Sequence, residues 1–203
     1  MLEKPATTQA PIHDLIAQRW SSRAFDKDRM LSNQEITSLI EAARWAPSCY
    51  GDEPWRFVVC DKATQPQAWQ NALDCLIGFN QTWVKNAPLL IVVAAVKQFK
   101  HNGEDNPWAM YDVGAACENL CLQAVALGMT THQMAGFNPE QLVQTFKLPE
   151  TVQATTIIAV GYRTKEMDVI EVEELREREL AERQRMPLDE LCFTGEWGQG
   201  FSD

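Results

Sequence analysis

Apolar and polar positions along the chain predict the strands of a β-sheet. Residues 89–96 are apolar without alternation, which is typical of a central strand that is covered on both faces. Residues 55–60 are rich in aromatic and β-branched side chains, and a similar run at 154–160 ends at Gly161. A shorter extended segment is expected at 130–134. The pattern therefore predicts a sheet with residues 89–96 at its centre.

Helical spacing of apolar residues predicts helices between and around these strands. Ser32 and Glu35 form a capping box ahead of an apolar stripe, and Pro47 should end that helix. Asn138 before Pro139 starts a later helix by similar cap chemistry. Helices are expected at about 12–19, 32–45, 64–85 (interrupted near Gly78 and Asn80), 106–128, 138–146 and 168–185.

The longest predicted helix starts with Asn106 as its cap and Pro107 in its first turn, and Gly128 closes it. One broad face is apolar, and the small residues 114–116 would let another helix approach closely. We interpret this helix as the central core helix or a dimer helix.

Chain length and patterning indicate one domain at residues 12–203, preceded by a flexible polar arm at 1–11. Residues 168–185 are dense in Glu and Arg, so that helix should lie on a surface or embrace a partner subunit. Residues 186–203 carry Leu188, Leu191, Phe193 and Trp197, which is too much apolar surface for a free tail. This last part of the chain should therefore pack on something.

Charge and composition narrow the classes of partner. The chain has 28 acidic and 18 basic residues and a net charge of -10, which argues against nucleic acid and fits small ligands. The longest apolar run, 87–96, is too short to span a bilayer, and no signal peptide is visible. Six cysteines lack C-x-x-C spacing and only three histidines are present, so we expect reduced thiols, a cytoplasmic protein and no metal site.

The segment Arg19-Trp20-Ser21-Ser22-Arg23-Ala24-Phe25, which we call the arginine segment, is a candidate anion site. Two guanidinium forks four residues apart, with a serine hydroxyl between them, suit the geometry of a phosphate. A solvated turn or helix end is the alternative for such a pattern alone.

Several motifs together resemble the FMN-dependent nitroreductase family, in the order of that family and over roughly residues 12–198. The arginine segment resembles the opening phosphate-and-ring motif. Other matching pieces are Glu41-Ala42-Ala43-Arg44-Trp45-Ala46-Pro47-Ser48, Pro54-Trp55-Arg56-Phe57, Phe79-Asn80, Ala87-Pro88, Asp112-Val113-Gly114-Ala115-Ala116, Gly136-Phe137, Ala159-Val160-Gly161-Tyr162 and Arg183-Gln184-Arg185-Met186-Pro187-Leu188.

The resemblance implies an α+β fold, with a three-layer α/β/α arrangement around a mixed, mainly antiparallel sheet. It also implies an intertwined homodimer, wrapped by the extension 163–203, with two FMN sites at the subunit interface. Arg19, Ser21, Arg183 and Arg185 would hold the phosphate, with Trp20 in the same motif. Arg23 would face the pyrimidine edge of the flavin.

The remaining residues that the resemblance assigns would surround the flavin ring. Asn80 would bond the flavin or its ribityl chain. Pro47, Ser48 and Cys49 would come from the other subunit. The strand that passes behind the ring would bring His132, Gln133, Met134, Ala135 and Gly136, with the Ala135 N–H near flavin N5.

Structural roles compete with some of these assignments. Asn80 could equally be a helix terminator, and His132 could be a structural residue of a buried strand. Cys49 could serve simply as a small side chain, and a Glu/Arg-dense helix would supply a surface arginine such as Arg183 in any case. Many relatives have amide side chains where this chain has Gly51 and Glu53. This difference affects the expected polar contacts to the substrate and not those to the flavin.

The function implied is an oxidoreductase with a ping-pong cycle. NADH or NADPH would reduce FMN, and a nitroaromatic, quinone or related small electrophile would then be reduced, with no catalytic side chain and no acid/base pair. The alternatives are a reductase specialised for one metabolite, such as a semialdehyde or enone, and a flavin-binding sensor or carrier without catalysis. A third is an acidic domain that has lost the flavin.

Overall fold

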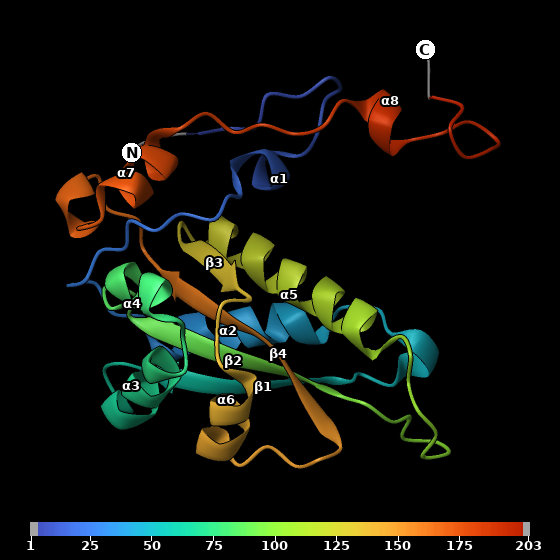
Figure 1. Cartoon of the computed structure of the whole chain (residues 1–203), viewed down its shortest axis with the longest axis horizontal. Helices are drawn as coiled ribbons and strands as arrows, with labels where there is room; N and C mark the ends of the chain where they lie inside the picture. The colour runs from blue at the N-terminus through green and yellow to red at the C-terminus, as the bar shows by residue number, and fades with distance from the viewer. Residues whose placement is uncertain (1–3, 201–203) are drawn as a thin grey trace.

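Four strands form the centre of the fold in a computed structural model that describes residues 4–200 (Figure 1). The strands are β1 (Trp55–Asp61), β2 (Leu89–Val96), β3 (Thr130–Met134) and β4 (Val152–Gly161). The helices are α1 (Asp14–Gln18), α2 (Asn33–Arg44), α3 (Pro66–Asp74), α4 (Gly78–Val84), α5 (Ala109–Ala126), α6 (Pro139–Phe146), α7 (Glu173–Leu180) and α8 (Leu188–Leu191), with short 3-10 helices at Cys49–Gly51 and Met167–Val169.

The sheet has the order β1-β2-β4-β3, and each neighbouring pair in it is antiparallel. β2 and β4 occupy the centre, as the unbroken apolar run of β2 predicts, and β3 lies at one edge. Within residues 4–200 the parallel pairing found is a single bridge, which joins Ser21 to Thr131 of β3. The arginine segment therefore continues the sheet beyond its β3 edge.

Helices cover both faces of the sheet, so the predicted three-layer α+β arrangement is confirmed (Figure 1). Alternate residues of β2 enter the two cores: Leu90 and Val92 pack with α3, α4 and α7, whereas Ile91 and Val93 pack with α2 and α5. The capping box of Ser32 and Glu35 is present at the start of α2.

Two predicted element boundaries were wrong. The long helix begins at Ala109 because the Asn106 side chain accepts the Trp108 N–H at 3.0 Å, which folds residues 106–108 into a turn ahead of the helix. Gly78 does not interrupt a helix but begins α4, and Asn80 lies inside α4. The break falls just earlier, where the Ile77 N–H donates to the Gly136 carbonyl at 3.0 Å.

The C-terminal part of the chain contains buried anchors and an exposed end. The helix predicted at 168–185 is limited to α7. Leu175 within α7 and Ile170 just before it are fully buried in the core. Beyond α7 the chain runs beside the N-terminal segment and leads to an end that projects from the body (Figure 1). Leu191 and Trp197 there are 56% and 90% exposed in the single chain.

The division into an arm at 1–11, a domain at 12–203 and an extension at 163–203 stays a prediction. Residues 1–3 of the arm and 201–203 of the extension lie outside the described residues. Ala6 of the arm donates its backbone N–H to the Ala17 carbonyl at 2.8 Å.

Gly161, at the end of β4, gives a first prediction. A Cβ added there would lie 2.6 Å from Pro88 Cδ and 3.0 Å from Phe25 Cδ1, and neither ring can yield easily. We expect Gly161→Ala to lower the free energy of unfolding by about 1–3 kcal/mol in urea titration, because overpacking a rigid site forces the backbone to shift. Gly78→Ala is the control, since its Cβ would meet nothing within 4 Å; equal stability of the two variants would contradict the prediction.

Candidate functional site

The arginine segment lies beside the edge strand β3. The Ser21–Thr131 bridge aligns the two, the Thr130 hydroxyl donates to the Trp20 carbonyl at 3.4 Å, and His132 Nδ1 lies 3.1 Å from the Ser22 carbonyl. These contacts bring together two groups of predicted site residues, 19–23 and 132–136, that are more than a hundred positions apart in the sequence.

Three guanidinium groups meet at the start of the arginine segment. Arg183 donates to the carbonyls of Lys4, Ala17 and Arg19 at 2.8, 2.6 and 2.9 Å. Burial lowers the pKa of Arg183, and the positive charges of Arg19 and Arg185 lower it further. Arg19 and Arg185 therefore each lie close enough to act on the charge of Arg183, although the chain as a whole is acidic.

Few acidic partners offset these charges. Arg19 has an ion pair with the half-exposed Glu118 at 3.6 Å. Arg185 is exposed, and its Nη1 donates to the adjacent carbonyl of Gln184 at 2.8 Å. An anion with several oxygen acceptors would relieve the repulsion between the guanidinium groups. The arrangement is thus chemically suited to a phosphate, with Arg183 fixing the backbone around it.

Arg23 is half-buried and lies beside aromatic rings. Its guanidinium carbon is 5.9 Å from the ring centre of Trp83, and the His132 ring is 4.6 Å from the same indole. Burial lowers the pKa of Arg23, and the Glu179 carboxylate acts in the opposite direction. The group remains a cation near neutral pH, because guanidinium holds its proton strongly.

His132 is a neutral side chain in this setting. Burial lowers its pKa to about 4, and the positive charge of Arg23 contributes in the same direction. The Ser22 carbonyl beside Nδ1 favours the tautomer that carries its proton there.

The pKa of His132 makes stability depend on pH. In the unfolded chain the imidazole binds its proton below about pH 6.5, whereas the folded protein does not bind it until about pH 4. Stability therefore falls as the pH drops through this window and gains nothing from the group above it. Urea titration at about pH 7.5 and 4.5 should show a loss of up to about 3 kcal/mol, at about 1.4 kcal/mol for each pKa unit.

His132→Gln should remove most of this pH-dependent loss, because an amide can still donate to the Ser22 carbonyl but does not titrate. His101→Gln is the matched control on an exposed histidine and should keep the full loss. The same pH dependence in His132→Gln and in the unmodified protein would contradict the account.

Asn80 and Gly136 meet at the end of β3. The Asn80 side-chain amide donates to the Gly136 carbonyl at 3.1 Å. Asn80 therefore connects α4 to the chain after β3. A Cβ on Gly136 would lie 2.8 Å from both Asn80 Nδ2 and Ile77 Cδ1. The glycine therefore lets the chain after β3 pass close to α4.

Pro47, Ser48 and Cys49 lie near the start of α5 and not beside the arginine segment. The Cys49 N–H donates to the buried carboxylate of Asp112 at 3.0 Å, near the start of α5. Glu118, the partner of Arg19, follows six residues later, which corresponds to about 9 Å along the helix. No hydrogen bond or ring contact within residues 4–200 joins the loop 47–49 to the arginine segment.

One residue that sequence reasoning missed, Glu179, holds the arginine segment in place. The Ser22 hydroxyl donates to Glu179 Oε1 at 2.5 Å, and the Arg23 N–H donates to Glu179 Oε2 at 2.9 Å. Glu179 is fully buried, although it belongs to a helix that its charge density marked as a surface element. Spacing gave one weak signal, since Glu179 follows the buried Leu175 by one helical turn.

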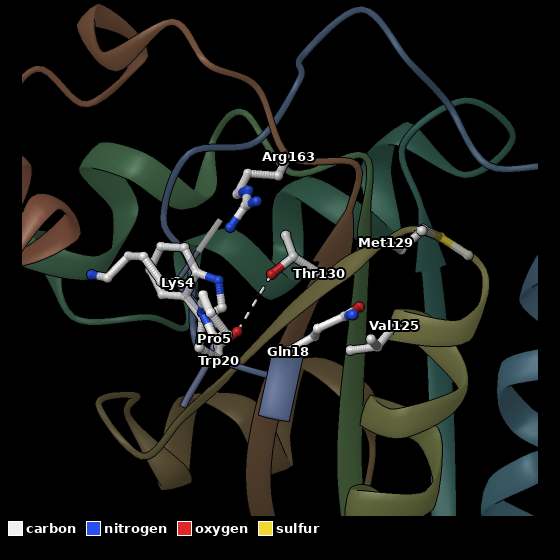
Figure 2. Close-up of a pocket in the computed structure, with 9 residues that line it drawn as sticks. Lys4, Pro5, Gln18, Trp20, Val125, Met129, Thr130 and Arg163 are labelled. Carbon is white, nitrogen blue, oxygen red and sulfur yellow. Dashed lines mark hydrogen bonds between the residues drawn. The ribbon is translucent and has the colours of Figure 1, made fainter. Parts of the chain in front are cut away.

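A cavity of about 250 Å³ lies on one side of Trp20 (Figure 2). Lys4 and Arg163 both lie over the indole ring, 4.5 and 5.2 Å from its centre. Trp20 is the one lining residue that belongs to the predicted flavin set, because the other walls come from Lys4, Pro5, Gln18, Val125, Gly128, Met129, Thr130 and Arg163. The cavity is therefore beside the guanidinium cluster and does not contain it.

The potential metal ligands of residues 4–200 are dispersed, and several of the cysteines are buried. No group of three potential metal ligands occurs within residues 4–200. The six cysteines are free, and burial raises the pKa of Cys60 and of Cys117 to about 12. No helix in this part of the chain is both long and apolar enough to cross a membrane.

The chain is similar to several known proteins over most of its length. Residues 16–162 match the model of the nitroreductase family. Protein DrgA of Synechocystis is 28% identical over 91% of this chain and 96% of its own length, and the major NAD(P)H-flavin oxidoreductase of Aliivibrio fischeri is 23% identical over 76% and 88%. A crystal structure described as an oxidoreductase containing FMN is 30% identical, with a TM-score of 0.88 over 95% of this chain and 96% of that one.

Proposed function

The chain belongs to the nitroreductase family, and from this premise we propose that it is an FMN-dependent oxidoreductase. It would take hydride from NADH or NADPH and reduce nitroaromatics, quinones or related small electrophiles in a ping-pong cycle. The relatives named as an NAD(P)H-flavin oxidoreductase and as an FMN-containing oxidoreductase support the cofactor and the donor.

The guanidinium cluster is the observation that carries the proposal. Arg19 and Arg185 bring positive charge to the start of the arginine segment, and Arg183 fixes the backbone there through three carbonyls. Ser21 would add a hydroxyl and a backbone N–H. Since charge-assisted hydrogen bonds to phosphate are strong and geometrically specific, this cluster fits the phosphate of FMN.

The proposed place of the flavin ring is at the exposed end of β3. Gly136 packs closely against Asn80 and Ile77 there, which leaves no room for a side chain. Gln133 and Ala135 are exposed on this edge, next to the half-buried His132. The proposed N–H donor to flavin N5 is that of Ala135.

A homodimer would complete the site. Pro47, Ser48 and Cys49 lie near the start of α5, away from the arginine segment of the same chain, so their proposed place over the flavin requires a second subunit. The exposed apolar side chains of Leu191 and Trp197 supply the surface that such a partner would cover. We propose that the extension 163–203 wraps around this partner.

Bound FMN would supply the redox chemistry, accepting hydride from the nicotinamide and releasing it to the acceptor. Arg19, Ser21 and Arg185 would hold the phosphate, and the strand behind the ring would orient the flavin. Arg183 was also predicted to bind the phosphate, but its guanidinium donates instead to three backbone carbonyls. Arg23 would supply a positive charge that favours the reduced ring. His132 stays neutral above about pH 4 and so adds no charge. We propose a cytoplasmic location and small-molecule partners, with no nucleic acid.

An absorption spectrum with anaerobic addition of NADH or NADPH tests this function. A yellow protein that either donor bleaches, and that small electrophiles reoxidise, is the expected result. Broad turnover of nitroaromatics and quinones would support the general reductase, and turnover of one enone or semialdehyde alone would indicate the specialised one. A yellow protein that neither donor bleaches would indicate a sensor or carrier. A colourless protein that takes up no FMN would contradict the proposal.

A further inference from the structure

Glu179 is a buried carboxylate with no place in the function described so far. It has no exposed surface, and each of its side-chain oxygens accepts one hydrogen bond from the arginine segment. The Ser22 hydroxyl also accepts the Ala24 N–H at 3.2 Å, so these bonds fix three consecutive residues. A single side chain from α7 thereby holds the backbone that carries Arg19, Ser21 and Arg23.

The residue also connects the two ends of the chain. The Glu179 carbonyl accepts the Lys4 ammonium at 2.7 Å, and the Lys4 carbonyl accepts a bond from Arg183 at 2.8 Å. Glu179 and Arg183 are only four residues apart in the sequence, and both bond to Lys4 of the N-terminal arm. The N-terminal arm, α7 and the arginine segment therefore meet at Glu179.

A buried charge at this place has an energetic cost that stability alone does not explain. Moving a carboxylate out of water is expensive, and well-packed apolar side chains often stabilise a protein as well or better. Glu179 Oε2 accepts the Arg23 backbone N–H at 2.9 Å, which places the carboxylate beside this residue, and its negative charge opposes the lowering of the Arg23 pKa by burial. The pair thus brings a negative charge next to the cation that is aimed at the flavin ring.

We propose that Glu179 is a positioning residue of the flavin site, which fixes the arginine segment through Ser22 and the Arg23 backbone and partly offsets the charge of Arg23. This inference rests on the proposed function. The carboxylate sets how strongly the site favours the anionic reduced ring. Because Glu179 belongs to the extension 163–203, docking of α7 and formation of the flavin site become one event.

Two substitutions separate geometry from charge. Glu179→Gln has the same shape: its amide oxygen can accept the Arg23 N–H, and its amide NH2 can donate to the Ser22 hydroxyl. Glu179→Ala removes both bonds. Glu177→Gln is the matched control, since Glu177 is an exposed glutamate of the same helix.

The measurements are FMN affinity, by fluorescence titration of the apoprotein, and the midpoint potential of the bound flavin. Glu179→Ala should weaken FMN binding about tenfold, because two buried donors lose their acceptors. Glu179→Gln should bind FMN with near-native affinity. It should favour reduced over oxidised FMN by about a further tenfold, which raises a two-electron potential by about 30 mV. Glu177→Gln should change neither quantity.

A purely structural role predicts a different pattern. Thermal stability would fall in Glu179→Ala and Glu179→Gln, while affinity and potential stayed native; that pattern would overturn the inference. If Glu179→Ala does not fold, Ser22→Ala replaces it, because that change removes one of the two bonds to Glu179 and should weaken FMN binding several-fold. Native FMN affinity in Ser22→Ala would also overturn the inference. Failure of the unmodified protein to bind FMN would refute the proposed function instead.

Discussion

Replacing Arg185 by alanine is expected to weaken FMN binding by about 10- to 100-fold, because a charge-assisted contact to phosphate contributes about 1.5–3 kcal/mol. Arg185 has an exposed guanidinium whose Nη1 donates to a neighbouring backbone carbonyl. Its loss should therefore leave the fold intact. Arg19→Ala should have a similar effect, since its ion pair with Glu118 is long, at 3.6 Å.

Titration of the apoprotein with FMN, followed by flavin fluorescence, measures both variants. Arg178→Ala is the control, because that arginine lies on α7 and pairs with Glu174. Arg183→Ala is a less specific test, since its three carbonyl contacts also hold the N-terminal arm and α1. Native FMN affinity in Arg19→Ala and Arg185→Ala together would show that the phosphate lies elsewhere.

Removing residues 162–203 should abolish both FMN binding and a well-behaved dimer. The deletion takes the fully buried Ile170 and Leu175 out of the core and removes Glu179 from the arginine segment. Losing a buried aliphatic side chain costs about 2–5 kcal/mol, so two such losses approach the whole stability of a domain. We expect aggregated or monomeric protein without flavin in size-exclusion chromatography with absorbance detection.

A shorter deletion, of residues 188–203, separates packing from wrapping. It keeps Leu175, Glu179 and Arg185 and removes the exposed apolar side chains of Leu188, Leu191 and Trp197. The shortened chain should fold as a monomer and bind FMN weakly, because the proposed partner loop 47–49 would be absent. A flavin-bound dimer after the longer deletion would refute the wrapping role of the extension.

Local chemistry in the sequence was enough to predict most elements of the fold. The capping box at Ser32 and Glu35 and the cap at Asn138 mark real helix starts, because each depends on neighbours three residues away. The apolar run of β2 likewise identifies a strand buried on both faces. The predicted helix break at Gly78 and Asn80 was wrong because a contact distant in sequence sets it. The Ile77 N–H donates to the Gly136 carbonyl.

The candidate site could be predicted in part. The motifs predicted a set of candidate residues, and the structure brings the arginine segment, β3 and Arg183 together. The bond between Ser22 and Glu179 spans 157 positions and joins a residue inside a known motif to one in a charged helix, so no local pattern could reveal it. The proposed place of loop 47–49 over the flavin would involve a second subunit, which the pattern of one chain does not describe.

The comparison of FMN with riboflavin tests the central claim most directly, because the two ligands differ by the phosphate alone. We predict that the apoprotein binds FMN at least about 100-fold more tightly than riboflavin, as two or more charge-assisted contacts to the phosphate require. The preference should shrink in Arg185→Ala, with riboflavin affinity unchanged. Equal affinity of the unmodified protein for the two flavins would contradict the phosphate site at Arg19 and Arg185.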